Sequence, residues 1–303
     1  MKLVLNILGI LCILFLVVFA AVCIISFIEN RRLCITKYHI KDPLIPKSFD
    51  GFRIVQLTDM HNTTFGEDNC RLIDAVTSLK PDIIVITGDM LVGIQNTDVS
   101  IAADTMNRLA TISPVYFSMG NHELRISRYI DIYGDMWKRF LDELSPDIHI
   151  LFDKTETVEN NGDKIYLHGL NLTPKLYTRL KDVHMPKKHL KKRFGICPHN
   201  EYHIFLAHNP DYFKDYANWG ANLTFSGHVH GGIMQLPFLG GVISPKLKLF
   251  PEYDKGLFEN SGKYMILSGG LGNHTIKFRI NNLPEIVIVT LENSGESEAY
   301  KIK

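Results

Sequence analysis

A short apolar segment at residues 81–90, PDIIVITGDM, most constrains what this chain can fold into. Ile83 to Thr87 carry no charge, and the run is bounded by Pro81 and by Gly88. An unbroken apolar run of this length is typical of a strand that is buried on both faces of a sheet. Ligands of α/β proteins bind at the carboxyl ends of such strands, which makes Asp89 a candidate functional residue. The alternative is an aspartate that caps the next helix.

The same arrangement recurs along the chain, and it predicts an α/β architecture. Strand-like runs alternate with helical patterns between residues 54 and 119, which is typical of a mainly parallel sheet flanked by helices. Between residues 148 and 167 the strand-like runs follow one another without helices, which predicts antiparallel pairing. The predicted strands are 54–58, 83–87, 114–119, 148–152, 156–158, 164–167, 203–207, 223–225, 264–267 and 285–291, and the predicted helices are 69–79, 97–110 and 131–144.

The first thirty residues differ from the rest of the chain. Residues 3–28 carry no charge, and this length exceeds the roughly 20 residues that span a bilayer as a helix. A secretory signal peptide with a cleavage site near Ala20 is the alternative, although its apolar part should be only about 7–15 residues long. We expect residues 1–30 to be a transmembrane anchor in the cell membrane, residues 31–50 a connector and residues 51–295 one folded domain.

The side of the membrane on which this domain lies is left open. Arg31, Arg32 and Lys37 follow the apolar segment, whereas only Lys2 and the amino terminus precede it. The larger number of basic residues after the apolar segment favours a cytoplasmic location for the domain, but long domains are translocated largely regardless of charge. The formal net charge of the chain is +1, so no general attraction to nucleic acid is expected, and we predict no nucleic-acid partner.

Polar side chains of the metal-binding type follow five of the predicted strands. In Asp59-Met60-His61 and in His228-Val229-His230 the first and third side chains would leave an extended segment on the same side, so that both could reach one ion. A mixture of imidazole and carboxylate suits Mn, Fe, Zn or Co better than Mg or Ca. The five motifs are Asp59-Met60-His61, Gly88-Asp89-Met90, Gly120-Asn121-His122-Glu123, Ala207-His208-Asn209-Pro210 and Gly227-His228-Val229-His230-Gly231-Gly232.

These motifs, in this order, resemble those of the calcineurin-like metallophosphoesterase superfamily over roughly residues 51–291. The segments GFRIVQLTDMH and GGLGNHTIKFRINNLPEIVIVTL resemble more specifically its membrane-anchored bacterial branch. The resemblance implies an α/β fold, a four-layer α/β/β/α sandwich of two mixed β-sheets flanked by helices. Residues 51–295 would then be the catalytic domain, and residues 1–30 the N-terminal transmembrane helix that precedes it.

The resemblance also implies two divalent metal ions and assigns their ligands. Asp59, His61 and His230 would ligate the first ion, Asn121, His208 and His228 the second, and Asp89 would bridge the two. His122 would face the substrate without ligating a metal, to stabilise or protonate the leaving oxygen. Val229 stands where threonine is common in the family, but it occupies a position between two ligands and does not put them in doubt.

The activity that the resemblance implies is that of a metal-dependent phosphohydrolase. Its substrate would be a phosphodiester or a pyrophosphate, including a lipid-linked one, attacked by a hydroxide that the two ions share. The ions exceed the charge of the Asp59 and Asp89 carboxylates by about two units, which favours a phosphate anion. The alternatives are a phosphomonoesterase or phosphodiesterase that acts on a soluble substrate, and a catalytically silent metal-binding scaffold.

Two further segments are candidates for contact with substrate or membrane. Residues 175–193 contain eight Lys or Arg against the single acid Asp182. They are either a solvated loop or a surface for lipid head groups or substrate phosphates. Residues 240–258, together with nearby Phe238, are the other candidate. Core packing is the alternative to contact with lipid for their large apolar side chains: Phe238, Leu247, Leu249, Phe250 and Phe258.

Overall fold

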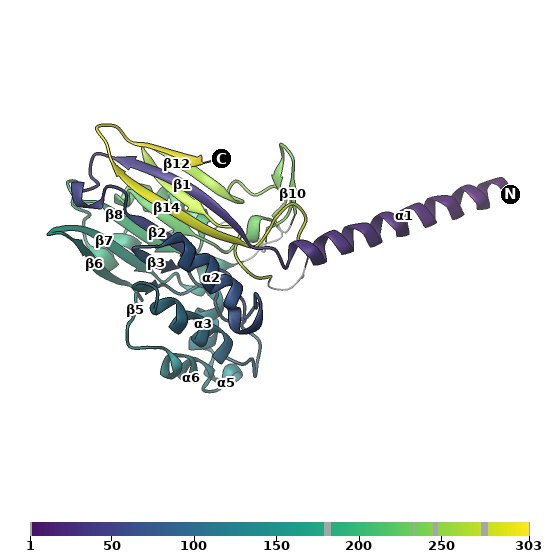
Figure 1. Ribbon diagram of the computed structural model, residues 1–303, viewed down its shortest axis with the longest axis horizontal. Coiled ribbons are helices and arrows are strands. Elements are labelled where there is room, and N and C mark those ends of the chain that lie inside the picture. The colour runs from purple at the N-terminus through teal and green to yellow at the C-terminus, as the bar shows by residue number, and fades with distance from the viewer. Residues whose placement is uncertain (1, 179–182, 233, 245–247, 274–277, 303) are drawn as a thin grey trace.

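The structure, a computed structural model, shows a domain of two stacked β-sheets from which one long helix projects (Figure 1). It describes residues 2–178, 183–232, 234–244, 248–273 and 278–302. The helices are α1 (Lys2–Glu29), α2 (Cys70–Leu79), α3 (Ser100–Ala110), α4 (Asn121–Arg128), α5 (Ile130–Tyr133), α6 (Met136–Glu143), α7 (His189–Phe194) and α8 (Phe213–Trp219).

The first sheet has seven strands in the order β15-β1-β14-β2-β3-β4-β5, and the second has six in the order β12-β13-β9-β8-β7-β6. The first consists of β15 (Glu298–Ile302), β1 (Cys34–Asp42), β14 (Glu285–Asn293), β2 (Arg53–Leu57), β3 (Ile83–Ile86), β4 (Val115–Phe117) and β5 (Ile148–Ile150). The second consists of β12 (Gly256–Asn260), β13 (Lys263–Leu267), β9 (Leu223–Ser226), β8 (His203–Ala207), β7 (Asp163–Leu170) and β6 (Lys154–Asn160). A separate hairpin is formed by β10 (Gln235–Leu236) and β11 (Gly240–Gly241).

The four layers follow from the alternating directions of the side chains along each strand. On β2, Val55 and Leu57 pack against helices α2, α3 and α6, whereas Ile54 faces the second sheet. On β8, Ile204 faces the first sheet and Phe205 packs against α7 and α8. Because successive side chains of a strand point to opposite faces, each sheet has one face against helices and one against the other sheet. The predicted α/β/β/α sandwich of two mixed sheets is confirmed.

The predicted pairing is confirmed in part. Strands β2, β3, β4 and β5 pair in parallel, and β6 and β7 pair antiparallel as expected. The run at residues 148–152 was expected to join the antiparallel group, and this is wrong, because β5 completes the first sheet beside β4. The chain then crosses to the other sheet within a few residues, so closeness in sequence does not imply pairing here. The helix predicted at 131–144 is divided at Gly134, whose φ is 59°.

Residues 34–42 were expected to belong to a connector and instead form β1. This strand pairs in parallel with β14, where Cys34 lies opposite Glu285, and antiparallel with β15. Its sequence, CITKYHIKD, mixes charges with apolar residues because only alternate positions are buried. Both of its partners lie about 250 residues further along the chain, so nothing near β1 in the sequence indicates the pairing. This part of the expected connector is a strand of the first sheet.

Helix α1 is exposed along nearly its whole length, and Ser26 is its one buried residue. It is long and apolar enough to cross a membrane, and a signal sequence would meet the same criteria. Its domain end is held by hydrogen bonds, since the N–H of Arg279 donates to Ser26 Oγ at 2.9 Å and the N–H of Asn282 donates to Glu29 Oε2 at 3.4 Å. The helix therefore meets the domain at residues 279–282.

Candidate metal centre

The predicted site residues follow the carboxyl ends of strands in both sheets. Asp59, Asp89 and Asn121 follow β2, β3 and β4 of the first sheet, and His208 and His228 follow β8 and β9 of the second. The carboxyl ends of these strands meet at one edge of the sandwich, where α/β proteins bind ligands. The structure brings these residues together, along with His61, His122 and His230, and apart from Asn121 all of them are buried.

The backbone at this edge is not extended, so the expectation that Asp59-x-His61 and His228-x-His230 lie on extended segments is wrong. The φ angles of Asp59, His61, His228 and His230 are 53°, 46°, 74° and 52°, and that of Asp89 is 53°. These are left-handed conformations, which non-glycine residues rarely adopt and which accumulate at functional sites. Asp59 converges with His61, and His228 with His230, because the backbone turns tightly between them. Alternation of side chains along a strand is not the cause.

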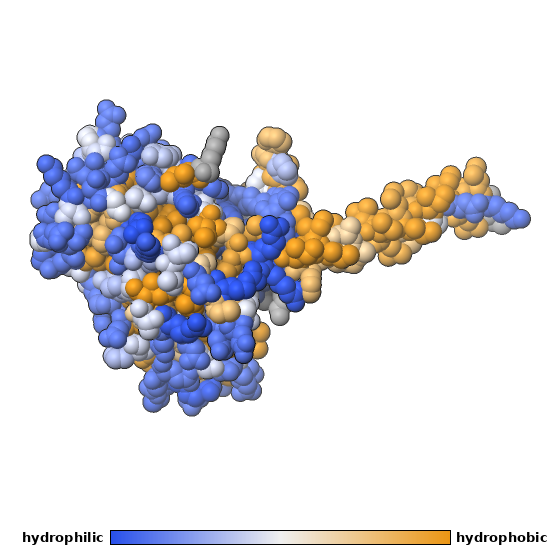
Figure 2. Space-filling view, viewed as in Figure 1, coloured by the Kyte–Doolittle hydropathy of each residue, from blue (hydrophilic) through white to orange (hydrophobic). Residues whose placement is uncertain are grey.

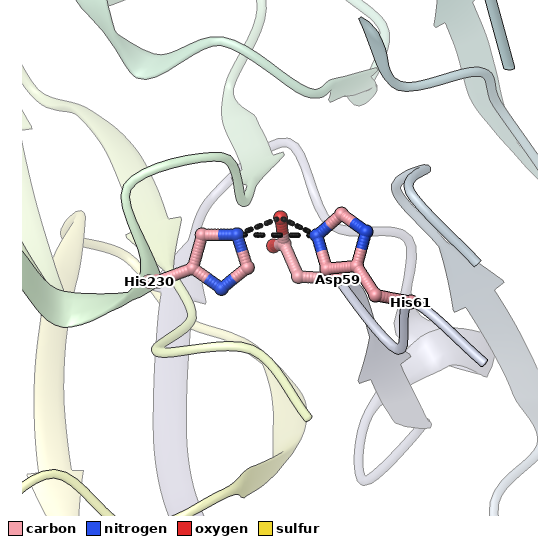
Figure 3. Close-up of side chains that lie close together, drawn as sticks. All are labelled: Asp59, His61 and His230. Atoms are coloured by element: carbon pink, nitrogen blue, oxygen red, sulfur yellow. Dashed lines mark hydrogen bonds and ion pairs between the residues drawn. The ribbon is translucent and has the colours of Figure 1, made fainter. Parts of the chain in front are cut away.

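Asp59, His61 and His230 form the first group (Figure 3). The Nε2 atoms of His61 and His230 are 3.2 Å apart, and Asp59 Oδ1 lies 3.3 Å from the Nε2 of His230 and 3.9 Å from that of His61. Both rings present Nε2 to the carboxylate (Figure 3). Two nitrogens and one oxygen at this spacing are a donor set that suits a transition-metal ion.

Asp89, His208 and His228 form a second group, in which the candidate ligand atoms lie within 4.8 Å of one another. Asp89 Oδ2 is 3.1 Å from the Nε2 of His208 and 3.8 Å from the Nε2 of His61. Asp89 therefore lies between the two groups. Burial raises the pKa of Asp89, but the histidines around it, His208 first, outweigh burial and hold that pKa well below its usual value. Asp89 is accordingly ionised at neutral pH.

Backbone carbonyls orient two of the imidazoles. The Nδ1 of His208 donates to Thr87 O at 2.6 Å, and the Nδ1 of His230 donates to Gly272 O at 3.1 Å. This bond leaves Nε2 of each ring facing a carboxylate, where it can either carry a proton or, as a neutral imidazole, ligate a metal ion. Burial lowers the pKa of His208, but Asp89 and Asp59 outweigh burial and raise it to about 9. The pocket thus stabilises positive charge at this nitrogen, and the residues present fit divalent cations.

Asn121 and His122 open helix α4. Among the residues that the structure describes, the buried Oδ1 of Asn121 has no hydrogen-bond partner, as a metal ligand would be expected to have none. The N–H of Gly93 donates to the Nδ1 of His122 at 2.6 Å. A neutral imidazole that accepts at Nδ1 carries its proton on Nε2. His122 lies near His61 and Asp89, yet this tautomer favours a hydrogen-bond donor over a metal ligand.

Glu123 positions the loop that carries Asp89, a role that the sequence reasoning did not assign. Its Oε2 accepts from the N–H groups of Asp89 and Gly120 at 2.7 and 2.9 Å, and its Oε1 accepts from Leu91 N at 3.0 Å. Burial, followed by the charge of Asp89, raises the pKa of this carboxyl. The GNHE motif contains the signal, because a glutamate three residues after a helix start commonly folds back on the backbone.

Arg279 is a second residue that the sequence did not reveal. Its guanidinium is buried and donates to the carbonyls of Gly269, Gly270, Gly272 and Asn282, with the bond to Gly272 at 2.6 Å. Burial lowers its pKa to about 10, so the side chain stays charged. Because Gly272 O also accepts from His230, Arg279 holds the loop that orients a candidate ligand. Arg279 lies within the segment 269–291 that resembles the membrane-anchored branch, but the resemblance assigned it no role.

The basic segment at 175–193 is only partly described. Lys187, Lys188, Lys191 and Lys192 are exposed on or beside α7, and Arg193 forms an ion pair with Asp153 at 3.0 Å. Arg179, Lys181 and Asp182 lie outside the described residues. At the start of this segment Tyr177 sits against the second group, with its ring centroid 5.3 Å from that of His228. Contact of the lysines with lipid or substrate remains a prediction.

The sandwich and its cluster of histidines and carboxylates define a metal-dependent phosphohydrolase, and the comparison with known families agrees. Residues 52–232 match the sequence model of the calcineurin-like phosphoesterases. The chain belongs to this family, as its motifs led us to expect.

Relatives align with nearly the whole chain. It is 28% identical over 276 residues to the uncharacterized metallophosphoesterase YkuE of Bacillus subtilis, covering 89% of each chain. It is 26% identical to the UDP-2,3-diacylglucosamine pyrophosphatase LpxG of Chlamydia muridarum, covering 87% of this chain and 91% of that one. It is 24% identical to the phosphodiesterase YaeI of Escherichia coli, covering 79% of this chain and 82% of that one.

Proposed function

We propose that this chain is a membrane-anchored phosphoesterase that binds two divalent metal ions and hydrolyses a phosphodiester or a pyrophosphate, with a lipid-linked substrate as the best candidate. The observation that carries the proposal is the pair of groups at the strand ends, Asp59-His61-His230 and Asp89-His208-His228, with Asp89 between them. Two relatives are named as a phosphodiesterase and as a pyrophosphatase of an acylated nucleotide sugar, which supports this substrate class.

The ligand assignment follows the two groups. Asp59, His61 and His230 would hold one ion, and His208, His228 and the Oδ1 of Asn121 would hold the other. Asp89 would contact both, because a carboxylate has two oxygens and carries the charge that an amide lacks. When bound, ions of this kind, with Mn, Fe, Zn or Co favoured by the imidazole ligands, supply a hydroxide nucleophile at neutral pH and stabilise negative charge on the phosphate oxygens.

The residues of the chain then position the substrate and the leaving group. Asp89 Oδ1 accepts from the N–H of His122 at 2.8 Å, which ties the first turn of α4 to the proposed bridging residue. Gly93 holds the His122 ring with a proton on Nε2, so His122 would donate a hydrogen bond to the leaving oxygen. This neutral form favours stabilisation of that oxygen over full transfer of a proton from an imidazolium.

Membrane anchoring rests on α1. A helix of 28 residues is about 42 Å long at 1.5 Å per residue, against a hydrocarbon core of about 30 Å. It would keep the domain at the bilayer surface, where an acylated phosphoester is found. The expected domain boundaries, with an anchor at 1–30, a connector at 31–50 and a catalytic domain at 51–295, belong to this proposal, and strands β1 and β15 add to the sheet of that domain from before residue 51 and after residue 295.

The test is hydrolysis by the full chain in detergent with Mn²⁺. The substrates would be an aryl phosphodiester, an aryl monophosphate and an acylated nucleotide sugar. We expect the wild type to hydrolyse a diester or the pyrophosphate, and Asp89→Asn to lose both turnover and metal. The control is Asp104→Asn, at an exposed position of α3. No hydrolysis with any divalent metal would instead support a silent scaffold, and wild-type metal content in Asp89→Asn would refute the bridging role.

A further inference from the structure

The hairpin that follows His230 exposes large apolar side chains at its tip. Phe238 and Leu239 lie between β10 and β11 and are 107% and 64% exposed. Leu249 and Phe250, on the segment that pairs with the hairpin, are 63% and 52% exposed. The N–H of Phe250 donates to Val242 O at 3.0 Å, which holds this second pair beside the hairpin.

Packing within the domain therefore does not account for these four residues, although it does account for another residue of the same segment. Phe258 packs against Phe213 and Met265, with Tyr253 edge-on at 5.1 Å. Leu247 lies outside the described residues. Single exposed apolar residues are common on protein surfaces, but four gathered on one hairpin and its neighbour indicate a binding surface.

This surface lies at the end of the domain from which α1 projects. The N–H of Gln235 on β10 donates to Ile280 O at 2.9 Å. Ile280 lies between Arg279 and Asn282, which both donate hydrogen bonds to α1. Figure 1 shows β10 beside the domain end of α1. Figure 2 shows orange atoms on the hairpin, which projects from the domain near the start of the apolar helix. The hairpin tip and the helix are thus two apolar surfaces at the same end of the domain, with hydrophilic residues between them.

We propose that Phe238, Leu239, Leu249 and Phe250 form a second membrane contact, which inserts into the bilayer interface beside α1. The proposal rests on the anchoring role of α1 in the proposed function. The position of these residues at the same end of the domain as that helix favours lipid over a protein partner as the occupant. Arg31, Arg32 and Lys248 are exposed at the same end, and basic residues around an apolar patch are typical of proteins that lie on anionic membranes.

The contact would keep the metal centre close to the bilayer surface, because the hairpin follows a candidate metal ligand directly in the sequence. Phe238 is eight residues beyond His230, so its Cα lies at most about 28 Å from that of the candidate ligand. The N–H₂ of Asn282 donates to His230 O at 2.6 Å, and that of Gln235 donates to Gly231 O at 2.7 Å. These bonds join the base of the hairpin to the site. The substrate class that fits is a phosphoester or pyrophosphate whose acyl chains remain in the membrane.

Tryptophan fluorescence of the full chain in vesicles of anionic and zwitterionic lipid tests the contact. Brominated acyl chains quench a tryptophan that enters the bilayer. We expect Phe238→Trp to be quenched beyond the wild type, whose two tryptophans give the background. The matched control is Ile196→Trp, because Ile196 is 72% exposed but precedes the amino end of β8, opposite the site. It should show no added quenching.

Each other outcome refutes a different part of the reasoning. A vesicle-bound Phe238→Trp chain without added quenching would overturn the second contact alone, and a dimer in those vesicles would assign the surface to a second copy of the chain. Loss of the chain from the vesicles would refute the anchoring itself.

A second test measures hydrolysis. We expect the double variant Phe238→Asp, Leu239→Asp to hydrolyse a vesicle-embedded substrate about tenfold or more slowly than the wild type, with hydrolysis of the aryl phosphodiester unchanged. Equal loss on both substrates would refute the proposal.

Discussion

Replacing Gly120 by alanine should force apart the loop that carries Asp89 and the first turn of α4, because the added methyl group has no room between them. Gly120 ends the loop before α4 and has φ −93°, which alanine adopts without strain. The change is therefore purely steric. An added Cβ would lie 2.1 Å from Asp89 Oδ1 and 2.5 Å from the backbone nitrogen of Asp89, whereas ordinary contacts begin at 3.4 Å.

Side-chain rotation of Asp89 cannot relieve this contact. The carboxylate could turn away, but the contact with the backbone nitrogen would still have to lengthen by about 0.9 Å, given the 2.5 Å and 3.4 Å separations. The loop of Asp89 or the first turn of α4 must shift by that amount, which breaks the bond from His122 N to Asp89 Oδ1. Overpacking of this kind costs about 1–3 kcal/mol of stability, and a shift of about 1 Å at a reacting centre lowers turnover by about 10²-fold.

The assay is turnover of an aryl phosphodiester, with metal content and Tm measured on the same preparations. Gly295→Ala is the control, since an added Cβ there has no atom within 4 Å. We expect Gly120→Ala to lose about 10²-fold in kcat and Gly295→Ala to match the wild type. Turnover of Gly120→Ala close to the wild-type value, with unchanged metal content, would refute the idea that the spacing between Asp89 and α4 is critical.

Three further predictions follow from the site and its support. His122→Ala should keep its metals by elemental analysis but lose about 10²–10⁴-fold in turnover, and an active variant would remove His122 from catalysis. Arg279→Met leaves several buried carbonyls without their donor and should lower the free energy of unfolding by about 3 kcal/mol. The measurement is urea denaturation, with Arg128→Met at an exposed position as the control. Equal stability of the two variants would contradict this prediction. Burial, followed by the charge of His203, lowers the pKa of His168 to about 3, so below about pH 6.5 the unfolded chain binds a proton that the folded chain excludes. Stability should then fall as the pH drops, by about 2 kcal/mol between pH 7 and pH 5 from this group, and an identical pH dependence in His168→Gln would refute the assignment.

The sequence by itself determined the strands that lie next to the site and the residues at their ends. The run at 83–87 is apolar because β3 is buried on both faces, and the strand predicted at 203–207 coincides with β8. Burial acts on each residue locally, so it leaves a pattern that can be read without knowing the partners. The five motifs follow from the same logic, since each lies where such a strand ends.

Tertiary structure alone decided which strands meet and how the side chains are held. Strand β1 belongs to the first sheet only because β14 and β15 return to it from the far end of the chain, and β5 lies beside β4 despite its closeness to β6. Asp59 and His61 converge through left-handed turns, which no spacing rule predicts. Arg279 supports His230 through a shared carbonyl. These features depend on contacts between segments that are distant in sequence, and the local pattern of residues does not indicate which distant segments will meet.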